Sequence, residues 1–488
     1  MTKKMTLGLF LVASIPIIVM GIYSATIILN GCINANDFSM YHQAVINVWE
    51  QAHLNPFVPV RGTRMLNDHF EPSLWIASIW VGLTSSEAIS LGAFELLIGL
   101  LTTSLPIFVG RNSAEKILGV FLLIFCRALL QGLEFPVHPT TWSAPLAWLL
   151  GVMIVRKNYR EAALIALILP IFREIYPFMA IGFATWLFYI KQRRLALAIT
   201  PVMLLWIAFS VWGRPALLGP TAKFHGSIAT DILADPLGLL WLKLTNPGIQ
   251  WNLFLQYIPL LGLFFWKKRS SINFKDPIFG IFAYIIPALG IHFLIGRMVH
   301  HHGIPMVLPL VGALTVIIPP ILSEYRKYIL VLCLLPLFLT STSRYQRALK
   351  LPIRGGDFRC EINSQKRSDM KELIAFAHQL SGSKKMLASG DVIPILAPTK
   401  LALYQISPYT YPEQYYEYIG ISKPGAGDPW PLNHEQQQSW LERCQSVGNI
   451  IFKNATYTIL EGHFTLDCIQ LDEIWNLGTN SELRVRQK

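Results

Sequence analysis

Charged residues are scarce in this chain. Asp, Glu, Lys and Arg make up 14% of its 488 residues, whereas hydrophobic residues make up 53%. Because soluble domains carry roughly 25% charged residues, this composition excludes an ordinary soluble protein. It predicts a polytopic α-helical membrane protein with room for an additional soluble domain. The formal net charge of +12 does not indicate a nucleic-acid partner, because the basic residues stand mainly in short clusters between apolar segments, where they orient helices in a bilayer.

The chain also lacks the short motifs of common soluble enzymes. It contains no glycine-rich phosphate loop, no Gly-x-Ser-x-Gly nucleophile elbow and no His-Glu-x-x-His zinc motif, so an activity driven by ATP or NAD is not expected. Cysteine is sparse, and the six cysteines form no CxxC pair and no zinc spacing. Three of them, Cys360, Cys444 and Cys468, fall in the C-terminal part. The sequence is compatible with one disulfide bond among them and equally with free thiols.

Long apolar runs, by contrast, are abundant. Residues 5–29 follow Lys3 and Lys4, and this run exceeds the apolar core of about 7–15 residues found in a signal peptide. It therefore predicts an uncleaved first helix with its N-terminus in the cytoplasm. Placing the later basic clusters on the cytoplasmic side predicts about eleven crossings, with large outside loops at 31–71 and 213–250.

The stretch 72–109 is longer than a single crossing requires. It predicts an interfacial helix, a bend near residues 84–86 and one crossing, although two crossings also satisfy its length. Further crossings are expected at about 117–130, 143–155, 161–190 (out and back around 173–177), 195–212, 251–266, 277–295, 304–322 and 328–341.

The composition changes at about Thr342, where long apolar runs stop and polar residues become frequent. We therefore expect a transmembrane domain over 1–341 and an extracytoplasmic α/β domain over 342–488. The expected elements of the second domain are a helix at 367–380, strands at 385–388 and 400–406, and a strand pair within 450–460.

Most of the unusual ionisable residues fall on one side of this topology. Charged groups gathered at one membrane face indicate chemistry or recognition there, whereas Arg127 stands inside an apolar segment. Ordinary explanations are also open: a solvated loop, an Asp37 cap on a helix over 38–50, or a local ion pair between Arg173 and Glu174. The residues are Asp37, His42, Asp68, His69 and Glu71 in the first outside loop, Glu134 and His138 in the next turn, Arg173 and Glu174 in the following turn, and Arg297, His300, His301 and His302 in a later one.

The first outside loop carries a family resemblance. The run 36–43, with Trp49, Gly62 and His69-Phe70-Glu71-Pro72, resembles the start of an uncharacterised family of predicted bacterial membrane proteins, known as a numbered domain of unknown function. That family continues with a Phe-His-Pro turn and a Lys-Glu-Asp turn. Here the first turn, 135–139, carries two extra residues, and 173–175 keeps the Glu of the second but loses its Asp.

That family looks like a branch of the GT-C superfamily, the membrane glycosyltransferases that use polyprenyl-phosphate sugars. The resemblance implies a multi-pass protein of the bacterial inner membrane that moves a sugar from a polyprenyl-phosphate-linked donor to an acceptor at the extracytoplasmic face. GT-C enzymes place their catalytic acid in the first outside loop just past the first helix, where Asp37 stands. Asp37 is therefore the expected general base.

The other candidate residues receive roles in the same scheme. His69, Glu71 and Glu174 are expected to help catalysis, the first two by orienting the acceptor or the base. Substrate contacts, including those to the phosphate whose charge grows on departure, are expected from His42, Glu134, His138, Arg173, Arg297, His300 and His302. A divalent metal ion, Mg²⁺ or Mn²⁺, is a further candidate, with Asp37 and Asp68 as its ligands.

Two other functions fit the same sequence. In a transporter or lipid flippase, the charged residues form a translocation path and the acids bind ions or protons. In a membrane assembly protein, the outer domain binds a partner and Asp37 is freely replaceable. The predicted placement of the ionisable residues at one face, rather than near the midplane, favours the transferase.

Overall fold

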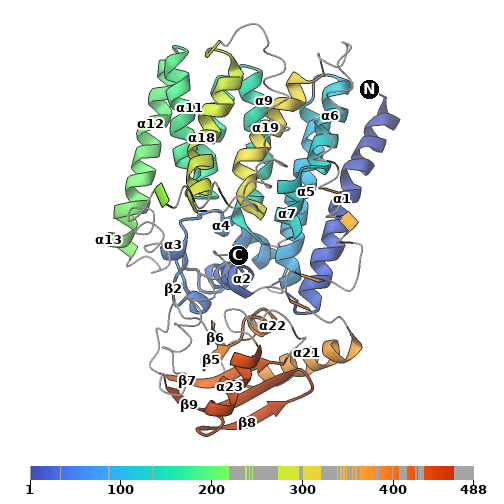
Figure 1. Cartoon of the computed structure of the whole chain (residues 1–488), viewed down its shortest axis with the longest axis vertical. Coiled ribbons are helices and arrows are strands. Elements are labelled where there is room, and N and C mark those ends of the chain that lie inside the picture. Colours follow the sequence, from blue (N-terminus) through green and yellow to red (C-terminus); the bar gives the residue numbers. More distant parts are fainter. Residues whose placement is uncertain are drawn as a thin grey trace. The chain divides into compact units, whose positions relative to one another are not determined.

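The chain divides into two units, one built mainly from helices and one from a sheet together with the first loop (Figure 1). We call the first the helical unit; it comprises Met1–Ser24, His69–Ser73 and Ala93–Leu349. We call the second the loop–sheet unit; it comprises Ala25–Asp68, Leu74–Gly92 and Lys350–Lys488. The computed structural model describes residues 2–32, 35–85, 88–134, 137–218, 273–295, 300–319, 363–380, 384–397, 401–405, 415–423 and 434–465, with a few short pieces between them.

Apolar helices dominate the helical unit. Within the described residues, three helices are long and apolar enough to cross a membrane: α1 (Lys3–Leu29), α5 (Ala88–Val109) and the continuous segment Arg193–Leu218. At 22 residues and 1.5 Å per residue, α5 is about 33 Å long, which matches the hydrocarbon thickness of a bilayer. The unit also contains α6 (Ser113–Ile124), α7 (Arg127–Glu134), α8 (Pro139–Trp142), α9 (Ala144–Val155), α10 (Tyr159–Ile168), η2 (Leu169–Ile171), α11 (Tyr176–Tyr189), α18 (Pro277–Ile295), η4 (His300–Gly303) and α19 (Ile304–Ile317).

Several further helices are apolar but short or bent. Helices α6 and α7 form a pair that bends by 47°, and Arg127 is the first residue after the break. The shorter apolar helices include α4 (Leu74–Leu83), α9, α18 and α19. These helices fit a polytopic membrane protein. The total of about eleven crossings remains a prediction, and the expected crossings at 251–266 and 328–341 lie outside the described residues.

The segment Arg193–Leu218 is not a uniform α-helix. Its first part, α12 (Arg193–Ala208), passes into the π-helical turn η3 (Phe209–Gly213), which is followed by α13 (Arg214–Leu218). Single π-helical turns within α-helices are rare and occur frequently at functional sites. Here the π-helical turn sets the position of Arg214.

Glycines allow two of the helices to approach closely. A Cβ atom at Gly151 of α9 would lie 2.0 Å from the carbonyl oxygen of Pro309 in α19, and one at Gly312 of α19 would lie 2.0 Å from that of Trp148 in α9. Small residues at crossing points are the usual means by which membrane helices pack. The pair α9–α19 is therefore a rigid centre of the helical unit.

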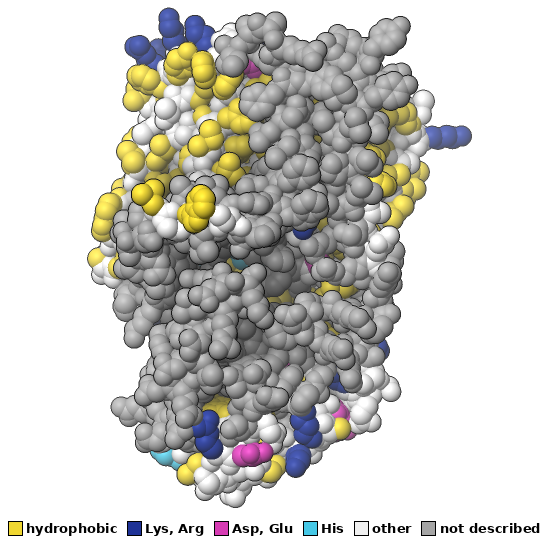
Figure 2. Space-filling view, in the orientation of Figure 1, with side chains coloured by type: hydrophobic (Ala, Val, Ile, Leu, Met, Phe, Trp, Pro, Cys, Tyr) yellow, Lys and Arg dark blue, Asp and Glu magenta, His cyan; other side chains and the backbone are white. Residues whose placement is uncertain are grey.

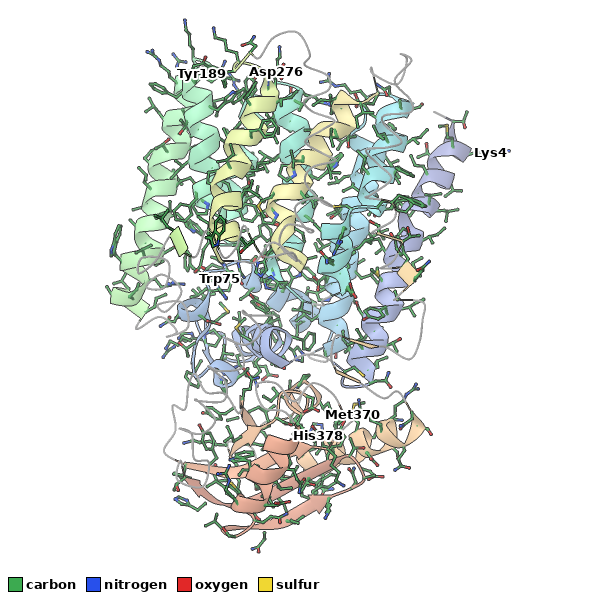
Figure 3. The ribbon with its side chains drawn as sticks, viewed as in Figure 1. Lys4, Trp75, Tyr189, Asp276, Met370 and His378 are labelled. Atoms are coloured by element: carbon green, nitrogen blue, oxygen red, sulfur yellow. The ribbon has the colours of Figure 1, made fainter. Side chains whose placement is uncertain are left out.

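The outer surface of the helical unit is apolar, as a bilayer requires. Figure 2 shows hydrophobic side chains on the parts of this surface that are drawn in colour, toward both margins of the view, and Leu197, Leu204 and Leu205 of α12 are all exposed. Lys191, Arg193 and Arg194 are exposed at the junction of α11 and α12, in the basic cluster expected on the cytoplasmic side. Figure 3 places the labelled Tyr189 and Asp276 at this same end of the unit.

A five-stranded mixed sheet forms the core of the loop–sheet unit. The strand order is β6-β5-β7-β9-β8, in which β5 pairs in parallel with β6 and β7, and β9 pairs antiparallel with β7 and β8. Trp440, Tyr416 and Phe464 are fully buried in the sheet's hydrophobic cluster. The elements of this part are β3 (Arg354–Gly355), β4 (Phe358–Arg359), α21 (Ser364–Ala377), β5 (Lys385–Ala388), α22 (Ile393–Leu396), β6 (Ala402–Gln405), β7 (Tyr415–Ser422), α23 (His434–Cys444), β8 (Gly448–Lys453) and β9 (Tyr457–Thr465).

Most of the first outside loop packs with this sheet. The loop contributes α2 (Ala35–Glu50), β1 (Phe57–Val58), η1 (Pro59–Arg61), β2 (Thr63–Arg64) and α3 (Met65–Asp68). The Gln43 side chain of α2 donates to the carbonyl of Leu403 in β6 at 3.4 Å and accepts from the N–H of Val60 at 3.2 Å. The loop thereby covers β6, an edge strand that would otherwise expose unpaired backbone groups.

The cysteines are not all equivalent. Cys32, just after α1, and Cys444, in α23, each take part in a disulfide bond. Cys126, at the break between α6 and α7, is a free and buried thiol. Cys444 is therefore disulfide-bonded, which is one of the two states compatible with the sequence.

Candidate functional site

The segment His69–Ser73 carries two candidate side chains into the helical unit. Pro72 prevents a helix from continuing through it, and the Ser73 N–H donates to the carbonyl of Ile171 at the end of η2, at 3.0 Å. The Phe70 ring packs against Trp206 and Phe209, with centroids 5.1 Å apart in each case. These contacts fix the chain on both sides of Glu71.

Glu71 forms a buried ion pair with Arg173. The Arg173 Nη1 atom lies 2.5 Å from Glu71 Oε1, and the Glu71 side chain is 0% exposed and that of Arg173 10% exposed. Removing two charges from water is costly, so a buried pair is weak support for stability alone.

Glu174 joins three groups from distant parts of the chain. Its Oε1 accepts hydrogen bonds from the Phe70 N–H and from Arg214 Nη1, each at 2.8 Å. Its Oε2 lies 3.4 Å from His69 Nδ1. Together with Glu71 and Arg173, these residues form what we call the carboxylate–arginine cluster: His69, Glu71, Arg173, Glu174 and Arg214.

The environment of Glu174 keeps it ionised. Burial by itself raises the pKa of this carboxyl group. The hydrogen bond and positive charge of His69, the charge of Arg214 and the hydrogen bond from the Phe70 N–H act in the opposite direction and prevail. The pKa of Glu174 is therefore held well below its ordinary value of 4.5. At neutral pH, Glu174 accepts hydrogen bonds and has no proton to donate.

A second group of candidates surrounds the turn between α7 and α8. Val137 adopts a left-handed backbone conformation, with φ at 70°, and its N–H donates to the carboxylate of Glu95 in α5. The next residue, His138, accepts from the Thr140 N–H through Nδ1 at 3.4 Å. Its ring centroid lies 6.2 Å from that of His302.

The two groups are linked through the helical unit. The hydroxyls of Ser143, at the start of α9, and Tyr176, at the start of α11, lie 2.5 Å apart. Tyr176 follows the Arg173–Glu174 turn by two residues, and Ser143 closes α8, which begins directly after His138. Residues from three of the predicted outside segments are thus joined by direct contacts or through their neighbours, and His302 comes from a fourth segment.

The remaining candidates lie elsewhere or outside the described residues. His42 is fully buried in α2 with its ring 5.5 Å from Phe38, and Asp68 is buried at the end of α3; both belong to the loop–sheet unit. Glu134 is half-buried at the end of α7. Asp37 lies in the first turn of α2 rather than ahead of it, and its side chain, like those of His300 and His301, is outside the described residues. Arg297 is outside them altogether.

Metal binding finds no donor set in the part of the chain that the structure describes. Within it, no three His, Cys, Asp or Glu side chains are grouped to hold a metal ion. The carboxylates of Glu71 and Glu174 face arginines instead. Metal ligation by Asp37 and Asp68 remains a prediction, because the Asp37 side chain lies outside that part.

Two contributors to the site were not selected from the sequence. Arg214 follows an apolar segment on the side expected to be outside, where arginine is less usual than on the cytoplasmic side. Glu95 is the one charged residue between Ala88 and Val109, and a charge within a membrane helix is costly. Both signals are visible in the sequence.

Comparisons with known proteins identify a related fold. No protein-family model matches the chain and no curated protein matches it, so the resemblance to the family of unknown function is not confirmed in that way. Among solved structures, the chain is similar to the crystal structure of ArnT from Cupriavidus metallidurans bound to undecaprenyl phosphate. The identity is 11%, the match covers 94% of this chain and 98% of that chain, and the TM-score is 0.51. The fold is thus similar to that of ArnT.

Proposed function

We propose that this chain is a membrane glycosyltransferase that moves a sugar from a polyprenyl-phosphate-linked donor to an acceptor at the extracytoplasmic face. The observation that carries the proposal is the carboxylate–arginine cluster, in which two buried arginines gather within a GT-C-like fold. ArnT was solved with undecaprenyl phosphate bound, and this supports a polyprenyl phosphate as the lipid part of the donor.

The arginines provide the binding site for the donor phosphate. A guanidinium offers five N–H donors in a planar fork that matches carboxylate and phosphate oxygens. Glu71 orients Arg173, and Glu174 orients Arg214. As the sugar departs, negative charge accumulates on the phosphate, and donors held in place beforehand stabilise that charge without reorganising.

Asp37 is the proposed general base. Its carboxylate accepts the proton of the acceptor hydroxyl, whose oxygen attacks the anomeric carbon of the sugar. The bond from that carbon to the phosphate oxygen breaks, and the polyprenyl phosphate leaves with the electron pair. His69 and Glu71 orient the reacting groups, and His138 with His302 adds contacts to the phosphate.

The disulfides support placement of the loop–sheet unit outside the cytoplasm. Cys32 and Cys444 are both disulfide-bonded, and disulfides persist mainly in oxidising compartments such as the bacterial periplasm. Both cysteines belong to the part of the chain expected outside on the basis of the basic clusters. The proposed location is therefore the bacterial cytoplasmic membrane, with the sheet on its outer side.

The test compares charge removal inside and outside the cluster. Membranes carrying Arg173→Gln, Arg214→Gln or Asp37→Asn at matched protein levels are assayed for sugar release from a polyprenyl-phosphate donor. Charge-assisted hydrogen bonds are worth about 1.5–3 kcal/mol, so each arginine variant should lose about 10- to 100-fold in rate. Loss of a general base lowers the rate by about 10²–10⁴-fold.

The matched control is Arg194→Gln, which removes an exposed arginine at the opposite end of α12. Full activity in all three variants would remove the cluster and Asp37 from the reaction.

One observation favours a second candidate, a lipid flippase. Arg127 starts α7 directly after the 47° bend between α6 and α7, and ionisable residues inside membrane segments often mark translocation paths. A flippase predicts that Arg127→Gln abolishes movement of a fluorescent polyprenyl phosphate across vesicles, with no sugar transfer in the unmodified protein.

A further inference from the structure

Glu95 is a buried carboxylate that the proposed reaction does not use. It is 2% exposed in the middle of α5, one of the three apolar helices long enough to span a membrane. Carboxylates at such positions are rare and usually functional. Its partner in the structure is a backbone group, the N–H of Val137, and not a basic side chain.

Val137 is an unusual residue to find at the point of contact. A β-branched residue with φ at 70° is a steric outlier, and such conformations persist only where the surroundings impose them. Two contacts join this turn to α5. The Glu95 carboxylate accepts a hydrogen bond from the Val137 N–H. The Phe94 and Trp142 rings pack edge-on, with centroids 5.1 Å apart. Helix α5 therefore holds the turn on both sides of His138.

We propose that Glu95 is a positioning residue that holds the left-handed turn at Val137 and so sets the imidazole of His138 beside His302. The Thr140 N–H points to His138 Nδ1, so in the neutral ring the proton resides on Nε2. Glu95 thereby fixes the position of the His138 side chain and the direction of its hydrogen bonds. Because His138 is proposed to contact the donor phosphate, this inference rests on the proposed function.

A double-mutant cycle separates positioning from mere support of the fold. Glu95→Ala removes the acceptor for the Val137 N–H, whereas Glu95→Gln keeps an amide oxygen of similar reach. Misplacement of a reacting group by about 1 Å lowers rates by about 10²-fold, so we expect Glu95→Ala to lower kcat by that order with little change in KM. Glu95→Gln should retain most of the activity. In a His138→Ala background, Glu95→Ala should cause no further loss. Thr103→Ala is the control, because Thr103 is buried in the same helix and bonds only to its own helix backbone.

A second measurement does not depend on transfer. His138 is 2% exposed, so diethyl pyrocarbonate should modify it slowly in the purified protein, as followed by mass spectrometry. Release of the turn in Glu95→Ala should raise that rate, and Glu95→Gln should not. If the unmodified protein transfers no sugar, the proposed function fails and this measurement still decides the role of Glu95. The inference is overturned if Glu95→Gln behaves like Glu95→Ala, if the effects of Glu95→Ala and His138→Ala add, or if His138 modification is the same in both Glu95 variants.

Discussion

At the residue scale, the carboxylate of Glu174 is held ionised by its neighbours. Glu174 accepts from Arg214 and from a backbone N–H, and Glu71 faces Arg173. Glu174 is therefore not placed as a proton donor. The cluster therefore acts as an electrostatic frame, and proton transfer in the proposed reaction falls to Asp37.

The lowered pKa of Glu174 predicts a pH dependence of stability. Because the folded-state pKa lies below the unfolded value near 4.5, the ionised group stabilises the fold above that pH, and the contribution is lost as the pH falls further toward the folded-state pKa. Thermal unfolding of the purified protein should show a falling Tm below about pH 5. Glu174→Gln should reduce this fall; an unchanged pH profile would contradict the assignment.

The ion pair between Glu71 and Arg173 predicts a large effect from removing one partner. Glu71→Gln removes the negative charge that faces the buried guanidinium of Arg173, and breaking a buried ion pair in this way costs about 3–5 kcal/mol. The exposed pair Lys384–Glu461, with side chains 37% and 47% exposed, is the control, since solvent and salt screen such pairs and they contribute little to stability. Unfolding of Glu71→Gln and Glu461→Gln in detergent measures both. Similar free energies of unfolding for the two variants would show that the buried pair contributes no more to stability than the exposed pair.

At the scale of single elements, apolar length and turn residues decide most of the fold. The expected bend near residues 84–86 falls between α4 and α5, and the expected strand 385–388 coincides with β5. The strand β7 was not predicted, because Tyr415–Ser422 has a Glu and a Gly in its interior and no clean alternation. Its position is fixed by pairing with β5 and β9, which a local pattern cannot reveal.

The close contact between α9 and α19 predicts sensitivity to a single methyl group. In Gly312→Ala the new Cβ meets the carbonyl oxygen of Trp148 at 2.0 Å, so the helices must separate; overpacking of this kind costs about 1–3 kcal/mol. Gly290→Ala in α18 is the control, because among the described residues no atom outside the backbone of its own helix lies within 4 Å of the added Cβ, and alanine favours a helix by about 1 kcal/mol. Thermal shifts of opposite sign are expected, and a stabilised Gly312→Ala would refute the packing.

At the scale of the whole molecule, the sequence indicates candidate residues but does not indicate which of them meet. His69, Glu71, Arg173 and Glu174 were all selected as candidates. The pairing of Glu71 with Arg173 spans 102 residues, and that of Gln43 with Leu403 spans 360. Such contacts depend on the full path of the chain. For the same reason, the grouping of most of the first loop with the C-terminal sheet was not foreseen.

The topology gives a prediction for the complete protein. A reporter that is active only outside the cytoplasm, fused after Lys488, should be active, because the loop–sheet unit carries disulfide-bonded Cys32 and Cys444. In the same cells, Cys444 should react with a maleimide only after reduction. A cytoplasmic signal from the fusion, with Cys444 already reduced, would place the sheet on the inner side.

The π-helical turn Phe209–Gly213 makes the cluster depend on the number of residues as well as on their identity. A π-helical turn accommodates about one residue more than an α-helical turn, and one residue corresponds to about 100° of rotation around the helix axis. Deleting one residue within Phe209–Gly213 would therefore let α12 continue without interruption and keep Arg214 on nearly the same face, beside Glu174. A substitution that turned the same five residues into an α-helix would instead rotate Arg214 by about 100° away from Glu174. Such a substitution would leave every charged residue of the cluster in the sequence and would still dismantle the cluster, so a comparison by composition alone would miss the loss.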